Sequence, residues 1–146
     1  MDSIDKISAH SKELAAAGSY RRIFVEISPG ELVDKISILE IKASRITEPH
    51  KLLNIRHELE LLTRVHDECM PKSAQLALLS ADLKTLNITL WNVEEEIRKE
   101  QAKRSRRRFI GFARTVYRNN DRRAALKRRI NILLGSPIIE EKSYIG

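Results

Sequence analysis

The longest hydrophobic pattern in the chain is a heptad-like repeat between residues 76 and 97. Seven apolar residues follow each other there at alternating spacings of three and four: Leu76, Leu79, Leu83, Leu86, Leu90, Val93 and Ile97. This spacing is typical of a long helix that packs lengthwise on a partner helix. Ser73 is placed to cap the start of this helix. We expect the rest of the fold to form around this seam.

A second helix is predicted to begin at Ser28. Ser28 can serve as the N-cap, Pro29 suits the first helical position, and the carboxylate of Glu31 can reach back to the cap amide. The main apolar stripe of this helix comprises Leu32, Ile36, Leu39, Ala43 and Ile46, and another face carries Ile38 and Ile41 beside Asp34 and Arg45. A helix that is apolar on more than one side is usually central to its domain.

A third helix is predicted between these two. Thr47 can cap it, Pro49 is tolerated in its first turn, and the helix should end near Pro71. Its apolar positions, again spaced by three and four, are Leu52, Ile55, Leu59 and Leu62. Links of only a few residues between long amphipathic helices favour antiparallel neighbours.

The C-terminal third of the chain is predicted to hold two shorter helical segments. The first comprises Phe109, Phe112, Ala113 and Val116, with Gly111 permitting close approach of a second backbone. Asn119 and Asn120 are predicted to break this helix and to cap a last one. That last helix carries Leu126, Ile130 and Leu133 on its inner side. Gly135 should end it, and Pro137 prevents its resumption.

The ends of the chain carry weaker patterns. Residues 2–17 are predicted to form a short amphipathic helix, so we assign residues 1–22 to a peripheral arm and residues 23–146 to a single helical domain. Ile23 to Ile27 (IFVEI) is a short β-prone run that could pair with residues 137–139. The predicted fold class is therefore an all-α antiparallel bundle with long coiled-coil-like helices and one minor strand near the N-terminus. Heptad positions left exposed could serve a homodimer.

Composition narrows the class of protein. The 146 residues carry a net charge of +7, and Cys69 is the only cysteine, so no internal disulfide can form. We see no targeting segment and no run of about 18 apolar residues, so we expect a cytoplasmic protein without a membrane span. Charge is uneven, since residues 98–129 hold fourteen Lys or Arg against two acids. Such asymmetry concerns partners rather than fold.

Five stretches carry a family resemblance: ISPGELVDKISILEIKASRI (27–46), KLLNIRHELELL (51–62), LWNVEEEIRKE (90–100), FARTVYRNNDRRAALKRRIN (112–131) and GSPIIEEKSY (135–144). Together they resemble a family of small bacterial and phage proteins classed as a domain of unknown function, from about residue 23 to the end. The resemblance implies a single helical domain and a context of cell-surface polysaccharide assembly, with no active-site residues to carry over. The resemblance departs at KRSRRR (103–108), where members of that family look more acidic.

One set of residues predicts a small-molecule site. Trp91 lies off the apolar seam beside charged residues, and a helix N-terminus at Asn120 with nearby Arg and Lys can hold an anion. The predicted ligand-binding set is Trp91, Glu94, Glu95, Arg98, Arg114, Tyr117, Asn120, Asp121 and Lys127. Its ligand would be a phosphate-bearing metabolite such as a sugar nucleotide. The alternative interpretation is a salt-bridge and capping network that pins helix to helix.

The basic block supports a second function class. Lys and Arg that neutralise phosphates release counterions, which gives sequence-independent affinity for nucleic acid. The residues predicted for this role are Lys103, Arg104, Arg106, Arg107 and Arg108. The simpler interpretation is a solvated basic face, since no nucleic-acid-binding motif accompanies it. Non-specific nucleic-acid binding is therefore the alternative function.

Enzymatic functions find less support. A Mg²⁺-dependent nucleotide hydrolase could draw on Glu31, Asp34, Glu58, Glu95 and Asp121, but their spacing does not repeat a paired acidic motif. The four histidines lack the i,i+4 spacing of a helical zinc site. We therefore expect a non-catalytic binding protein with no cofactor and no metal. An anionic small molecule, nucleic acid and a second copy of the chain are the candidate partners.

Overall fold

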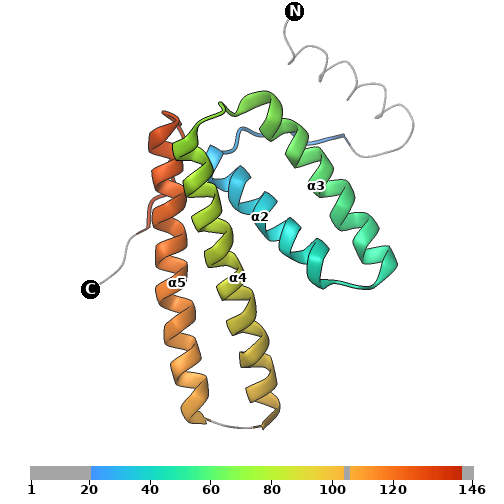
Figure 1. The fold of residues 1–146 in the computed structure, drawn as a ribbon, viewed down its shortest axis with the longest axis vertical. Helices are drawn as coiled ribbons and strands as arrows, with labels where there is room; N and C mark the ends of the chain where they lie inside the picture. The colour runs from blue at the N-terminus through green and yellow to red at the C-terminus, as the bar shows by residue number, and fades with distance from the viewer. Residues whose placement is uncertain (1–20, 104–105, 143–146) are drawn as a thin grey trace, which may run out of the picture.

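The protein is an all-α bundle. The computed structural model describes residues 21–103 and 106–142, which form α2 (Pro29–Arg45), α3 (Pro49–Cys69), α4 (Ala74–Lys103) and α5 (Arg106–Leu133) (Figure 1). Over the described residues there is no strand, so the short strand predicted at residues 23–27 is wrong. Its candidate partner, residues 137–139, lies instead in a tail tied to α5 by ion pairs from Lys127 to Glu140 and from Arg128 to Glu141. The helix predicted at residues 2–17 falls outside the described residues.

Local capping signals set the starts of α2 and α4. Ser28 Oγ accepts a hydrogen bond from Glu31 N at 3.2 Å, and Ser73 Oγ accepts one from Leu76 N at 3.2 Å. Both predicted caps are confirmed. The cap predicted at Thr47 is wrong, because Pro49 occupies the first turn of α3 and Glu48 takes the N-cap position without a side-chain hydrogen bond.

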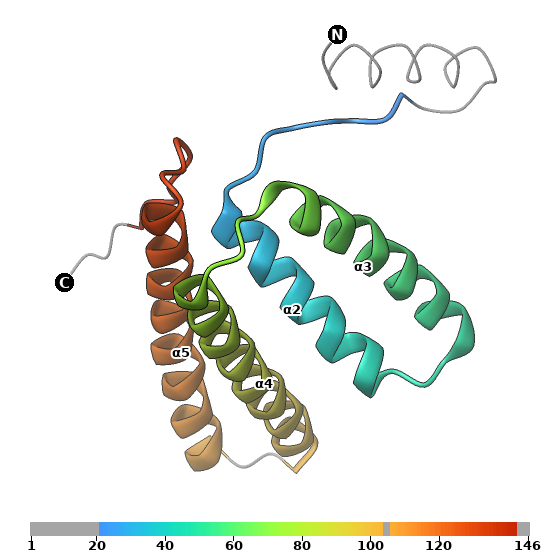
Figure 2. The same cartoon turned by 45° about the horizontal axis from the view of Figure 1, so that its top comes forward.

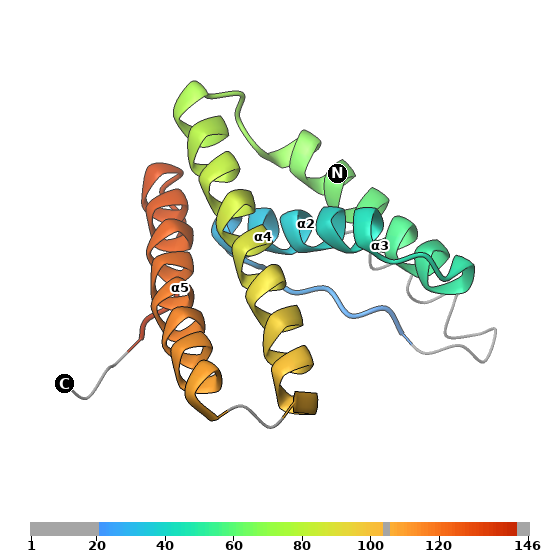
Figure 3. The same ribbon diagram turned by 60° about the horizontal axis from the view of Figure 1, so that its bottom comes forward.

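Helices α4 and α5 form a long antiparallel hairpin, and α2 packs across one side of it (Figures 1 and 2). Helix α3 returns alongside α2 and packs on no other described helix (Figure 3). α2 is therefore the central helix, as its two apolar faces predict. Nowhere in the described helices is there a segment long and apolar enough to cross a membrane.

The core lies where α2 meets the hairpin. Val33, Leu76, Leu79, Leu83 and Ile130 form its buried cluster, and Leu83 and Ile130 are fully enclosed. The predicted seam on α4 is buried from Leu76 to Leu90, whereas Val93 and Ile97 are half-buried. α3 contributes no buried residue, which leaves its outer leucines in solvent.

The predicted helix break at Asn119 and Asn120 is wrong, because α5 runs through both asparagines. An asparagine inside a helix costs only a fraction of a kcal/mol, roughly 0.7 relative to alanine, and packing of α5 along α4 outweighs it. The close backbone approach predicted at Gly111 is also wrong, since nothing lies within 4 Å of a Cβ built there. Gly135 does follow the end of α5, with a left-handed φ of +65°.

Candidate functional site

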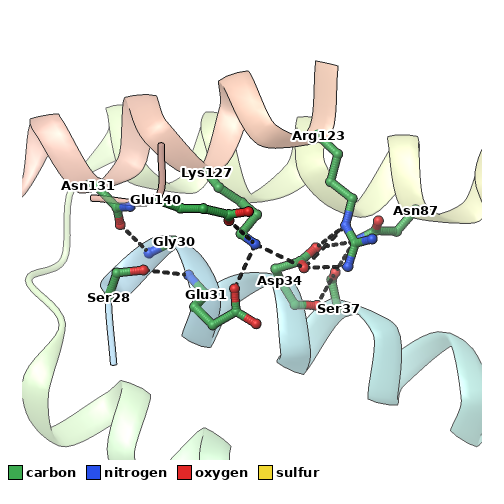
Figure 4. Close-up of polar contacts among 10 residues, drawn as sticks. All are labelled: Ser28, Gly30, Glu31, Asp34, Ser37, Asn87, Arg123, Lys127, Asn131 and Glu140. Atoms are coloured by element: carbon green, nitrogen blue, oxygen red, sulfur yellow. Dashed lines mark hydrogen bonds and ion pairs between the residues drawn. The ribbon is translucent and has the colours of Figure 1, made fainter. Parts of the chain in front are cut away.

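A buried polar network joins α2 to the hairpin, and Asp34 is its centre (Figure 4). Asp34 is 1% exposed. Its carboxylate accepts a fork of two hydrogen bonds from Arg123, from Nε to Oδ1 at 2.9 Å and from Nη2 to Oδ2 at 2.5 Å, and a longer third one from Nε to Oδ2 at 3.2 Å. Asn87 Nδ2 donates to the same Oδ1 at 2.8 Å and to Ser37 Oγ at 2.7 Å. One carboxylate therefore links three helices.

Lys127 extends the network toward the C-terminal tail. Its Nζ lies 2.6 Å from Glu31 Oε2, 3.1 Å from Glu140 Oε2 and 3.9 Å from Asp34 Oδ2. Burial lowers the pKa of Lys127, but hydrogen bonds to Glu31 and Glu140 outweigh burial, so the pKa is raised overall. The hydrogen bond to Asp34 likewise raises the pKa of Arg123. Both cations therefore remain charged across the physiological pH range.

At the start of α2 the backbone itself meets α5. Gly30 N donates to Asn131 Oδ1 at 2.7 Å, and Asn131 is 1% exposed. Within the described residues, no enclosed side-chain nitrogen or oxygen lacks a partner. The network is thus satisfied by the protein alone and holds α2 on the hairpin. We call it the clamp, and its members are Gly30, Glu31, Asp34, Ser37, Asn87, Arg123, Lys127 and Asn131.

Sequence reasoning gave Glu31 and Asp34 other roles, whereas for Lys127 it kept open a salt-bridge network that pins helix to helix, which is the role that the structure gives it. It missed the remaining members of the clamp. Those are Gly30, Ser37, Asn87, Arg123 and Asn131. One available signal was the spacing of Arg123, Lys127 and Asn131, polar residues four apart that share a face of α5. The other was an aspartate placed between two apolar faces of α2.

The predicted ligand-binding set is divided by the fold. Trp91 Nε1 donates to Glu95 Oε1 at 2.8 Å, and Glu95 lies 4.0 Å from Arg45 at the end of α2. Lys127 belongs to the clamp. The remaining members lie along α4 and α5: Glu94, Arg98, Arg114 and Tyr117 are exposed, and Asn120 and Asp121 are half-buried. The helix N-terminus predicted at Asn120 does not exist, because α5 is continuous there.

The carboxylates considered for a hydrolase are not gathered either. Glu31 and Asp34 pair with Lys127 and Arg123, and Glu95 accepts from Trp91. Among the residues that the structure describes, no three His, Cys, Asp or Glu side chains are grouped to hold a metal ion. Of the predicted basic cluster, Arg107 and Arg108 are exposed, and Arg108 Nη1 lies 3.4 Å from Glu100 Oε1. Arg104 and the side chains of Lys103 and Arg106 lie outside the described part.

A groove of about 450 Å³ runs between α4 and α5. Its α4 wall carries Asp82, Thr85, Leu86 and Thr89, and its α5 wall carries Asn119, Arg122, Ala125, Leu126 and Arg129. The groove is lined by none of the clamp residues of these two helices, which are Asn87, Arg123, Lys127 and Asn131. The groove is therefore a separate site from the clamp.

Asn119 is the distinctive residue of the groove. It is 8% exposed, yet its side-chain amide bonds to none of the described residues. Because every fully enclosed polar atom in that part of the chain has a partner, the amide keeps its access to solvent through the groove. An amide that opens to a groove and has no partner among the described residues is available to a bound molecule.

Two guanidinium groups accompany this amide. Arg122 and Arg129 are exposed, and neither forms an ion pair with a described residue. Asp82 on the facing helix is likewise unpaired there, while Thr89 Oγ1 donates to Thr85 O at 3.1 Å. Free guanidinium and amide donors at one groove suit an oxyanion, since Arg binds phosphate and carboxylate with paired N–H donors. Sequence reasoning missed this groove because it read Asn119 as a helix break.

Comparison with known proteins places the chain in a family. Residues 23–146 match the model described as "Family of unknown function (DUF6165)", and the chain therefore belongs to that family. Neither the curated proteins nor the solved structures yielded a match to this chain. The family description assigns no activity.

Proposed function

We propose that this protein binds a phosphate-bearing metabolite, such as a sugar nucleotide, in the groove between α4 and α5. The observation that supports this is the amide of Asn119, a residue only 8% exposed, which opens to the groove without a partner in the described chain. Beside it lie two arginines that form no ion pair with a described residue. The protein acts by binding rather than by catalysis. The ligand set expected from the sequence, with Trp91 at its centre, is replaced in this proposal by the groove residues.

The groove also contains a group that suits the sugar part of such a ligand. The Asp82 carboxylate accepts hydrogen bonds and repels anions, so it favours a molecule that presents hydroxyl donors beside its phosphate. Leu86 and Leu126 add apolar surface to the lining. A mixed lining of this kind is typical of small-molecule sites, in which a few polar groups orient the ligand. The ligand of a cell-surface polysaccharide pathway would fit this description.

Titration calorimetry with inorganic phosphate, glucose 1-phosphate and UDP-glucose tests the proposal. We expect the double variant Arg122→Gln/Arg129→Gln to weaken binding at least tenfold, since hydrogen bonds to charged groups contribute roughly 1.5–3 kcal/mol each. Asn119→Leu should weaken it as well, because the amide donor is lost. Arg98→Gln removes an exposed arginine of α4 outside the groove and should leave binding unchanged.

Two results would contradict the groove as the binding site. One is UDP-glucose affinity that is unchanged in the double variant. The other is an equal loss in Arg98→Gln, which would return the site to the residues around Trp91. A protein whose melting temperature is unaffected by every ligand of the panel would refute the proposed function itself.

A second proposal concerns self-association through α3. Leu53, Leu61 and Val65 are 69%, 46% and 44% exposed along this helix. Its first half carries Lys51 and Arg56 against Glu58, whereas its second half carries an excess of acids: Glu60, Asp67 and Glu68 against Arg64. An antiparallel second copy of α3 would therefore set opposite charges against each other while covering the leucines.

Light scattering after size exclusion tests this association. The expected mass is twice the 16.8 kDa of one chain. Leu61→Lys should shift the protein to the monomer, because a charge at the contact is desolvated without a partner. Leu78→Lys places the same charge at an exposed leucine of α4 and should leave the dimer intact. A parent protein that is monomeric at high concentration would exclude the α3 contact.

A further inference from the structure

One side of α5 carries a row of arginines that have no partner among the described residues. These are Arg107, Arg114, Arg118, Arg122 and Arg129, at successive spacings of seven, four, four and seven. At 3.6 residues per turn these spacings place all five on one side of the helix, which we call the arginine stripe. All five are exposed, and none forms an ion pair or a hydrogen bond with another described side chain.

Where the structure describes the side chains of the other cations of α5, those cations are paired, and Arg108 pairs with Glu100 at 3.4 Å. Arg123 binds Asp34, Lys127 binds Glu31 and Glu140, and Arg128 binds Glu141. Asp121 is close to the stripe in sequence but forms no ion pair with it. Acidic neighbours thus meet these other cations of α5 on the sides toward α2, α4 and the tail, whereas no described acid forms an ion pair with the stripe. A row of like charges on one helix is unfavourable unless a partner neutralises it.

The dimensions of the stripe suit a chain of phosphates. Its two ends are about 33 Å apart along the helix at 1.5 Å per residue, and neighbouring arginines are separated by about 6 or 10 Å. Tyr117, 59% exposed, lies between Arg114 and Arg118 in sequence and presents an aromatic ring beside them. A basic track with an adjacent aromatic ring is the pattern by which proteins hold single-stranded nucleic acid.

We propose that single-stranded nucleic acid binds along α5, with its backbone phosphates on the arginine stripe. This function goes beyond metabolite binding, because three of the five arginines lie outside the groove. A bilayer surface fits the stripe less well. The two residues that continue the stripe between the arginines are Gly111 and Ala125, which provide no apolar anchor for a membrane.

Fluorescence anisotropy with a labelled 20-nucleotide single strand of mixed sequence tests the proposal on the full chain. The triple variant Arg107→Gln/Arg114→Gln/Arg118→Gln should lose at least tenfold in affinity at 50 mM salt. Each phosphate contact contributes about 0.7 to the slope of log affinity against log salt, so the slope should fall by roughly 2. These exposed side chains have no partner in the part of the chain that the structure describes, so the variant should fold as the parent does.

A charge-matched control separates the stripe from general attraction. Lys35→Gln/Arg56→Gln/Lys72→Gln removes three exposed cations that are unpaired in the described chain and lie on other elements. It should bind the strand nearly as the parent does. Equal losses in both triple variants, or no binding by the parent, would overturn the proposal. The proposal would also be overturned if the parent protein sedimented with anionic phosphatidylglycerol vesicles but did not bind the strand.

The proposal of metabolite binding and the proposal of single-strand binding can be tested independently of each other. The stripe triple variant should keep its affinity for UDP-glucose, because none of its three positions lines the groove. Asn119→Leu should lose UDP-glucose but retain the single strand, since it removes no charge. If Asn119→Leu and the stripe triple variant each abolished both UDP-glucose binding and single-strand binding, the stripe and the groove would be one binding site. The proposal of a separate nucleic-acid surface would then be wrong.

Discussion

Replacing Asp34 with alanine is expected to lower the free energy of unfolding by about 3–5 kcal/mol, because removal of one partner leaves the other charge of a buried pair uncompensated. Arg123 loses both hydrogen bonds of its fork, and Asn87 loses an acceptor. The side chain of Arg123 is 29% exposed, so it regains some hydration and the loss should fall at the lower end of that range. Urea unfolding followed by circular dichroism measures it.

Two further variants test the cause of that loss. Asp34→Asn keeps the shape and one acceptor oxygen, so it should recover part of the lost stability but not the charge pairing with Arg123. Asp82→Ala removes an exposed aspartate of the groove that has no partner in the described chain, and it should unfold at nearly the same urea concentration as the parent. If Asp34→Ala lowered the free energy of unfolding by less than about 1 kcal/mol, the Asp34–Arg123 pair would contribute no more than a surface ion pair does, and the prediction would be wrong.

Much of the fold follows from local sequence rules. The caps at Ser28 and Ser73 depend on residues three positions apart, and the seam from Leu76 to Leu90 depends on helical periodicity alone. Such short-range signals can be read without knowledge of the fold. The capping assignment failed at Thr47, where the position of the proline in the first turn decides which residue becomes the cap.

The continuity of α5 could not be read in this way. Asn119 and Asn120 favour a break by intrinsic propensity, but the loss is small beside the packing of a 28-residue helix on α4. A helix break at these asparagines also predicts an anion site at a helix N-terminus beside Asn120. That N-terminus does not exist, because α5 is continuous through this position. The same residue, Asn119, became informative only when the groove around it was known.

The clamp was missed for a related reason. Asp34 and Arg123 are 89 positions apart, and helical periodicity gives the face of a residue but not its partner on another helix. Net charge was equally uninformative about the arginines of α5. The net charge includes every arginine of α5 alike, whereas in the fold some of these arginines pair with acids and others form the arginine stripe.

At Gly30, α2 packs so closely on α5 that there is no room for an added side-chain carbon. A Cβ at Gly30 would lie 2.5 Å from the backbone oxygen of Lys127 and 2.9 Å from Asn131 Oδ1. We expect Gly30→Ala to lower the free energy of unfolding by about 2–3 kcal/mol, since overpacking costs roughly 1–3 kcal/mol and a strained hydrogen bond adds to it. The start of α2 would have to move away from α5. Thermal unfolding should show a clear fall in melting temperature.

Gly111→Ala is the matched control for Gly30→Ala, because Gly111 also lies within a helix but a Cβ there would meet no neighbouring atom within 4 Å. Alanine there should raise stability by about 0.5–1 kcal/mol through its better helix propensity. The same substitution is thus expected to act with opposite signs at the two glycines. If Gly30→Ala were also stabilising, α2 would not approach α5 as closely as the hydrogen bond from Gly30 N to Asn131 Oδ1 requires.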